Sequence, residues 1–172
     1  RVITQFINPR YRLVSLVSAY SGLRLKNVVH LKRSEVNLKD GWLNIKSQSK
    51  TGKPVSIPIT PGLRKVFKWI KVWPLRNEDR FFPNVSEKPI SVQVGRAFKK
   101  AGIPWGSFHH FRHFAACELI NNGVPLEVVR EFLCHSDIKS TLVYARLKGE
   151  KLQEAVSGFD TTLTQIEGQE FD

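Results

Sequence analysis

Four short segments, far apart in the sequence, carry side chains suited to phosphate chemistry. They are residues 20–24, 49–53, 109–113 and 134–137, and Tyr144 follows His135 by nine residues. The planar fork of an Arg side chain matches two phosphate oxygens, so two Arg residues can neutralise a pentacoordinate phosphoryl transition state. Tyr is a candidate nucleophile, and a Lys on a turn can protonate a leaving oxygen. The combination predicts phosphoryl transfer.

The third segment illustrates why spacing matters as well as residue type. Residues three apart share a helix face, so His109 and Arg112 can point at one ligand. In the first segment, Gly22 permits a tight turn that places Arg24 at the start of a helix. The sequence has no carboxylate cluster for metal ions, so we expect chemistry without a metal or any other cofactor.

Net charge indicates the kind of partner. The chain has 172 residues, with 27 Lys and Arg against 15 Asp and Glu, a formal charge of +12. Residues 147–172 carry two basic and six acidic side chains, whereas residues 1–146 carry 25 basic and nine acidic ones. A body of +16 attracts polyanions, which favours a nucleic acid as partner over the alternative of a merely solvated basic surface.

Length and composition limit the number of domains and the class of protein to which this chain can belong. A chain of this length fits one domain, and its 41% hydrophobic and 24% charged residues are typical of globular proteins. Its apolar runs are too short for a membrane-spanning helix, so we expect no membrane partner. Two Cys indicate a reducing compartment, and we expect a cytoplasmic location. The absence of Met suggests part of a longer polypeptide.

Apolar periodicity and turn residues predict an α+β fold that is mostly α-helical, with one small three-stranded antiparallel sheet. A loop anchored by Phe81 and Phe82 is expected over 74–90. The predicted strands are 35–38, 42–46 and 54–57. The predicted helices are 9–21, 25–32, 61–72, 91–101, 108–122, 125–134, a short helix that starts within 136–141 and carries Tyr144, and 149–157.

The four segments together resemble the motifs of the tyrosine recombinases, or phage-type integrases. The matching residues are SGLR at 21–24, KTGK at 50–53, HHFRH at 109–113, and LCH at 133–135 followed by Tyr144. The resemblance covers about residues 10–156 in order and spacing, and it implies the catalytic-domain fold of that family. Asn27, His110 and Cys134 depart from the usual pattern, which suggests a divergent branch without removing a proposed catalytic group.

The resemblance also implies a role for each site residue. Tyr144 would attack the scissile phosphate of duplex DNA, forming a 3′-phosphotyrosyl link and freeing a 5′ hydroxyl. Arg24 and Arg112 would clamp the phosphate, while Lys50 would protonate the leaving oxygen. His109 and His135 would hydrogen-bond the phosphate or handle the tyrosine proton. The implied function is therefore site-specific DNA recombination or integration by strand breakage and rejoining, independent of metal and ATP, with no small-molecule substrate.

The resemblance divides the chain into a catalytic domain over 1–156 and an acidic tail over 157–172. We expect the tail either to dock on a neighbouring protomer or to be a solvated extension. We expect a tetramer on DNA and a monomer when free, and we expect the family's N-terminal DNA-binding domain to be missing from this chain.

Other interpretations stay open. A type IB topoisomerase-like enzyme would use the same groups, although the short hairpin and the nine-residue spacing from His135 to Tyr144 favour a recombinase. A non-catalytic DNA-binding module would have the same fold but would not cleave DNA. A zinc site from His113, Cys117, Cys134 and His135 is disfavoured, because adjacent residues seldom both reach one ion. For His113, a structural hydrogen bond and a direct role remain equal alternatives.

Overall fold

The computed structural model describes residues 2–6, 8–45, 54–72 and 79–133. Its elements in chain order are η1 (Ile3–Gln5), α1 (Pro9–Ser21), α2 (Leu25–Val29), η2 (Arg33–Glu35), β1 (Val36–Asn37), β2 (Trp42–Ile45), β3 (Val55–Pro58), α3 (Pro61–Val72), α4 (Glu87–Lys100), α5 (His109–Asn121) and α6 (Leu126–Phe132). The predicted class, mostly helical with a three-stranded antiparallel sheet, is confirmed.

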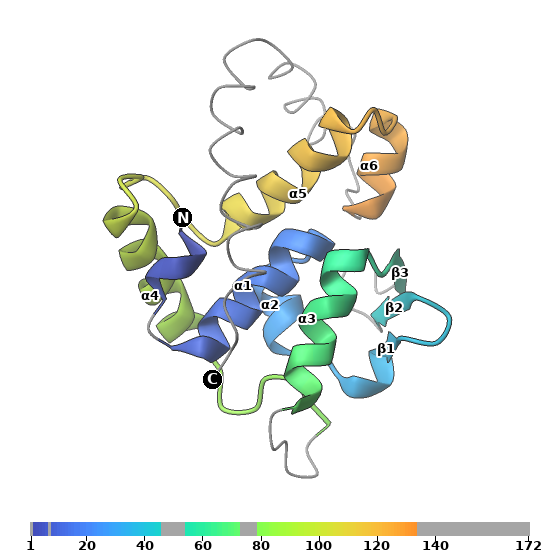
Figure 1. The fold of residues 1–172 in the computed structure, drawn as a ribbon, viewed down its shortest axis with the longest axis horizontal. Coiled ribbons are helices and arrows are strands. Elements are labelled where there is room, and N and C mark those ends of the chain that lie inside the picture. Colours follow the sequence, from blue (N-terminus) through green and yellow to red (C-terminus); the bar gives the residue numbers. More distant parts are fainter. Residues whose placement is uncertain (1, 7, 46–53, 73–78, 134–172) are drawn as a thin grey trace.

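Helix α1 lies at the centre of the fold. It begins where the Asn8 side chain accepts a hydrogen bond from the Arg10 amide, with Pro9 at the first helical position, and it ends at Gly22 in the left-handed region. Figure 1 shows α1 between α4 on one side and α3 on the other, with α5 and α6 packed across its C-terminal end. Because neighbours cover it on several sides, apolar residues cannot be confined to one stripe, and Leu13, Val14 and Leu16 are all buried.

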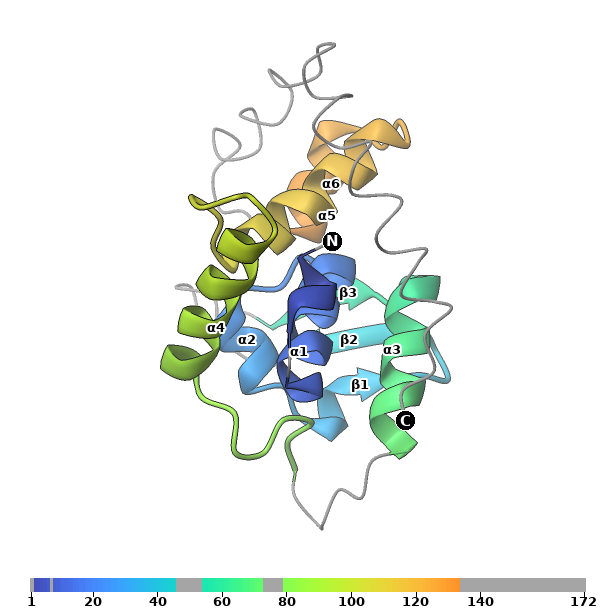
Figure 2. The same ribbon diagram turned by 60° about the vertical axis from the view of Figure 1, so that its left-hand side comes forward.

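The sheet is a meander in the order β1, β2, β3, with antiparallel neighbours. Leu43 pairs with Ile57, and both side chains are fully buried, while Trp42 and Asn44 on β2 face outward. This alternation is typical of a sheet with one buried face. Figure 2 shows the sheet on the side of α1 opposite α4, with α3 running alongside the strands.

Several element boundaries differ from the predicted ones, and three of the differences have a clear local reason or consequence. Helix α2 ends at Val29 rather than near Lys32, and Glu35 belongs to η2 rather than to the first strand. The Glu35 carboxylate accepts a hydrogen bond from the Lys32 amide at 2.8 Å, which holds that turn. Helix α4 begins at Glu87, four residues earlier than predicted, because the Pro89 in its first turn needs no amide partner there.

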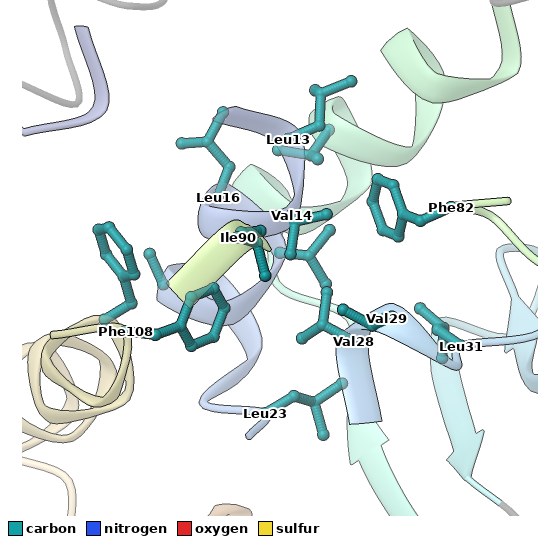
Figure 3. Close-up of a cluster of buried hydrophobic side chains, with 14 of the residues drawn as sticks. Leu13, Val14, Leu16, Leu23, Val28, Val29, Leu31, Phe82, Ile90 and Phe108 are labelled. Carbon is teal, nitrogen blue, oxygen red and sulfur yellow. The ribbon is translucent and has the colours of Figure 1, made fainter. Parts of the chain in front are cut away.

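One apolar cluster joins the helices and the sheet. Figure 3 shows side chains from α1, from the α1–α2 region and from the later chain meeting in it, among them Leu23, Val28, Phe82, Ile90 and Phe108. The predicted anchoring of the 74–90 loop by Phe81 and Phe82 is confirmed in its described part, since both rings are buried. Among the described residues, no helix is long and apolar enough to span a bilayer. The core thus fixes the ends of α1 and α5, where the candidate site lies.

Candidate active site

The turn between α1 and α2 presents Arg24. Gly22 has φ +67°, and its amide donates to the Ser18 carbonyl at 2.8 Å, closing α1 with a left-handed cap. The Ser18 hydroxyl then donates to the Leu23 carbonyl at 2.8 Å. Arg24 follows in extended conformation as the N-cap of α2, and its side chain is exposed. These local bonds fix where the Arg24 backbone leaves the core.

Gly22 also packs closely against the end of α6. A Cβ placed at Gly22 would lie 2.5 Å from Leu133 Cδ2 and 3.3 Å from Phe132 Cε1. Only a residue without a side chain lets α6 approach this turn. The close contact places Leu133, the residue before Cys134, beside the turn that carries Arg24.

Arg112 joins the same two segments by hydrogen bonds. Arg112 is 3% exposed, and its Nη1 and Nη2 groups donate to the carbonyls of Gly22 and Leu133 respectively. Burying a guanidinium is costly unless its N–H groups find acceptors, and these main-chain carbonyls supply one acceptor to each Nη group. Arg112 therefore holds together the α1–α2 turn, α5 and the end of α6.

His109 occupies the first position of α5 and lies within the electrostatic field of both Arg residues. Burial, followed by the positive charges of Arg112 and Arg24, lowers the pKa of His109 below its usual value. The two cations lower this pKa because they disfavour a third positive charge near them. The charges of Arg112 and Arg24 therefore both act on His109 and favour its neutral form.

Two further histidines line the first turns of α5. The His110 Nδ1 accepts a hydrogen bond from the Ser107 amide at 3.0 Å, so this ring is tied to the segment just before the helix. The His113 ring meets His109 edge to face at 4.6 Å between centroids. Burial and then the charges of His109, His110 and Arg112 lower the pKa of His113 to about 4. His113 is therefore a neutral neighbour of His109 at physiological pH.

The remaining predicted site residues, Lys50, His135 and Tyr144, lie outside the described residues. Leu133 nevertheless leads directly into Cys134 and His135, so the chain enters the fourth segment next to Arg112. Within the described residues, no three His, Cys, Asp or Glu side chains gather as a metal site would require, and the zinc alternative involves two residues outside them.

The carbonyl partners of Arg112 were not identified from the sequence. A main-chain carbonyl has the same chemistry at every position, so no residue type marks Gly22 or Leu133 as an acceptor. The available signal was indirect: a Gly immediately before the Leu23–Arg24 pair permits close approach by another segment. The hydrogen bond from the Ser107 amide to the His110 ring was also not identified from the sequence.

Comparison with known proteins agrees with this geometry. Residues 2–151 match the model of the phage integrase family. The chain is 29% identical over 157 residues to the tyrosine recombinase XerA of Pyrococcus furiosus, covering 86% of this chain and 54% of XerA. It is 26% identical over 149 residues to the tyrosine recombinase XerD of Staphylococcus aureus, covering 81% and 50%. The chain thus spans about half the length of these curated relatives.

Solved structures share the fold. The crystal structure of XerA recombinase superposes with a TM-score of 0.72 at 23% identity, over 92% of this chain and 61% of that one. The catalytic domain of bacteriophage HP1 integrase gives 0.66 at 25% identity, over 91% and 88%. A λ integrase dimer bound to a COC′ core site gives 0.70 at 19% identity, over 87% and 57%. The family model matches most of this chain, and the chain shares its fold with integrase catalytic domains. This chain therefore belongs to the phage integrase family and has a tyrosine recombinase catalytic-domain fold.

Proposed function

We propose that this chain cleaves and rejoins duplex DNA at specific sites, as the catalytic domain of a tyrosine recombinase. The observation that supports the proposal is that the charges of Arg112 and Arg24 both act on His109. These residues come from two separate segments, and the Arg112 contact to Leu133 brings in a third. The family membership and the +16 charge of residues 1–146 support DNA as the substrate.

In the proposed reaction, the Tyr144 oxygen attacks the scissile phosphorus and displaces the 5′ oxygen of the next nucleotide. The P–O5′ bond breaks as the 3′-phosphotyrosyl bond forms, and Lys50 supplies the proton that the leaving oxygen takes up. Arg24 and Arg112 stabilise the added negative charge of the transition state. Because the covalent link replaces one phosphodiester by another, a 5′ hydroxyl can reverse the step without ATP.

Neutral imidazoles suit this reaction. A neutral His109 can both donate and accept a hydrogen bond, so it can contact a phosphate oxygen or help to move the Tyr144 proton. His135 is proposed to share that work from the fourth segment. The low pKa of His109 keeps its ring in the neutral form while the two Arg side chains carry the positive charge.

Covalent trapping tests the proposal. The full chain is incubated with a library of randomised duplexes, each nicked near its centre so that the short cleaved strand diffuses away. DNA that stays bound to protein under denaturing conditions is recovered and sequenced. We expect enrichment of one site, and we expect Tyr144→Phe to abolish the covalent complex.

Matched controls come from the other two tyrosines. Tyr11→Phe and Tyr20→Phe also remove a phenolic hydroxyl, and both variants should still form the covalent complex. No covalent DNA from the wild type, or an undiminished yield from Tyr144→Phe, would rule out the proposed chemistry and favour a non-catalytic DNA-binding module.

The second candidate, a type IB topoisomerase-like activity, differs in outcome. Such an enzyme relaxes supercoiled plasmid without pairing two sites, whereas a recombinase exchanges strands between two duplexes that carry the selected site. We further propose that four protomers assemble for this exchange, that the free chain is monomeric, and that it acts on DNA in the cytoplasm. Light scattering with and without the selected duplex tests the assembly.

A further inference from the structure

The connection between α4 and α5 exposes a large aromatic side chain. Trp105 is 73% exposed, although most of the Phe, Leu and Ile side chains that the structure describes are buried. Leaving an indole in water forgoes a large gain from apolar burial. An exposed aromatic of this size is a feature of contact surfaces for a partner.

The main chain around Trp105 is held in place by the core. Gly102 turns the chain at φ +83°, and the Ile103 amide donates to the Phe98 carbonyl at 2.9 Å. The Gly106 amide donates to the Ile103 carbonyl at 3.0 Å. A Cβ at Gly106 would lie 2.0 Å from the Phe98 ring, so the turn sits directly on a fully buried side chain. Trp105 is therefore presented outward by an ordered turn.

This turn leads directly into the candidate active site. Two residues after Trp105, the Ser107 amide bonds the His110 ring on the first turn of α5. His109 is four residues after Trp105, which limits their Cα separation to about 14 Å by chain length alone. A nucleotide strand rises about 3.4 Å per step, so Trp105 can reach a nucleotide within about four steps of a phosphate at His109.

The charges beside Trp105 indicate the kind of partner. Arg96, Lys99 and Lys100 are exposed at the C-terminal end of α4, just before the turn. Among the described residues, none of these three cations forms an ion pair with a carboxylate. An exposed indole next to cations without an ion-pair partner is typical of surfaces that bind single-stranded nucleic acid. On such surfaces, aromatic rings stack on bases and basic side chains bind the phosphate backbone.

We infer that the α4–α5 connection is a DNA contact in which Trp105 packs against a nucleotide flanking the cleaved phosphate and Lys99 and Lys100 bind the adjacent backbone. This inference rests on the proposed function. It names the part of the DNA that this surface recognises: a nucleotide whose base becomes accessible beside the strand break.

Equilibrium binding of the full chain to a nicked duplex tests the inference over a series of salt concentrations; the duplex carries the trapped site where trapping selects one, and otherwise any nicked duplex that the wild type binds. Trp105→Ala should weaken binding roughly tenfold, as loss of one stacking contact does, with an unchanged dependence on salt. Lys99→Gln and Lys100→Gln should each reduce the slope of log K against log salt by about one, because each loses one phosphate contact.

A matched control comes from a second exposed tryptophan. Trp42 is 44% exposed on β2, which lies across α1 from the α4–α5 connection (Figures 1 and 2). Trp42→Ala should change DNA affinity by less than about twofold. Quenching of tryptophan fluorescence by the nicked duplex should be smaller in Trp105→Phe than in the wild type, and unaltered in Trp42→Phe.

Each remaining outcome decides the question. Unchanged affinity and quenching in the Trp105 variants would overturn the inference. A Trp105→Ala variant that instead dissociates a DNA-free oligomer would assign the surface to a second copy of the chain. A wild type that binds the duplex but forms no covalent complex would sink the proposed activity and leave the Trp105 comparison valid. Failure of the wild type to bind any duplex would overturn both.

Discussion

Arg112 on α5 donates a hydrogen bond to the carbonyl of Gly22, which lies 90 residues earlier in the chain. The same guanidinium donates to the Leu133 carbonyl at the end of α6. Arg112 is therefore a structural tie as well as a proposed phosphate ligand. Arg24, which is proposed to bind the same phosphate, is exposed and belongs to the turn that Arg112 holds.

This difference predicts that replacing Arg112 lowers both the stability and the activity of the protein, whereas replacing Arg24 lowers the activity alone. Arg112→Ala leaves two buried carbonyls without their donor, so we expect it to lower the free energy of unfolding by about 2–4 kcal/mol. Arg24→Ala removes an exposed side chain and should cost less than about 0.5 kcal/mol. Both variants should lose at least about 100-fold in covalent trapping. Urea denaturation and trapping assays measure the two effects, and an equal loss of stability would contradict the assignment.

Substitution of Gly22 should be much more damaging than substitution of other glycines. In Gly22→Ala, both the positive φ and the approach of Leu133 oppose the added methyl, so we expect a loss of about 2–4 kcal/mol. Gly102→Ala has a similar φ but no atom within 4 Å, so its expected cost is about 1 kcal/mol. Gly95→Ala within α4 should stabilise the protein by about 0.5–1 kcal/mol, because it meets nothing within 4 Å. A different order in thermal or urea unfolding would contradict this account.

The pKa of His113 predicts a loss of stability in mild acid. The ring takes up a proton near pH 6.5 in the unfolded chain but only near pH 4 in the folded one. Between these values the unfolded state binds more protons, so the free energy of unfolding falls as the pH falls from 6.5 to 4. Because His113 is only half buried, we expect roughly 1 kcal/mol from this group. Urea midpoints at pH 7.5 and 5.0 measure it.

His113→Asn should shrink the difference between those two midpoints, whatever its effect at pH 7.5. An undiminished difference in His113→Asn would assign the acid sensitivity to other groups. The low pKa of His109 adds a loss in the same direction, so some acid sensitivity should persist in the variant.

Cys117 should be an unreactive thiol. Its side chain is buried in α5, and burial, followed by the nearby Glu118, raises the pKa of the thiol. In a Cys134→Ser background it is the only cysteine, since the chain has two. At pH 8 a thiol reagent such as DTNB should modify it at least about tenfold more slowly in the folded protein than in urea. Equal rates would show that α5 opens readily.

Local patterns in the sequence predicted most of the elements and failed at specific boundaries. Asn8 and Pro9 marked the start of α1, Gly22 marked its end, and the buried face of α3 followed its apolar period. The start of α4 was placed too late because Pro89 signals a break in general but is permitted in a first helical turn. Such an exception depends on position within the helix, which composition does not specify.

The candidate site divides in a similar way. Residue types, spacing and the resemblance to the family motifs selected Arg24, His109 and Arg112 as candidates, because phosphate chemistry requires forked cations and imidazoles; their catalytic roles remain predictions. Lys50, His135 and Tyr144 stand as predictions from the same motifs. The sequence left the role of His113 open, and the structure places its ring against His109.

The sequence by itself thus determined the helical order, the small sheet, the basic character and the choice of phosphate-binding side chains, since these follow from local periodicity and side-chain chemistry. Only the tertiary structure decided that Arg112 is buried on two main-chain carbonyls while Arg24 is exposed, and that Trp105 faces outward on an ordered turn. Those properties depend on which surfaces meet when distant segments pack. Carbonyl acceptors and close approaches such as Gly22 to Leu133 exist only once α1, α5 and α6 have come together.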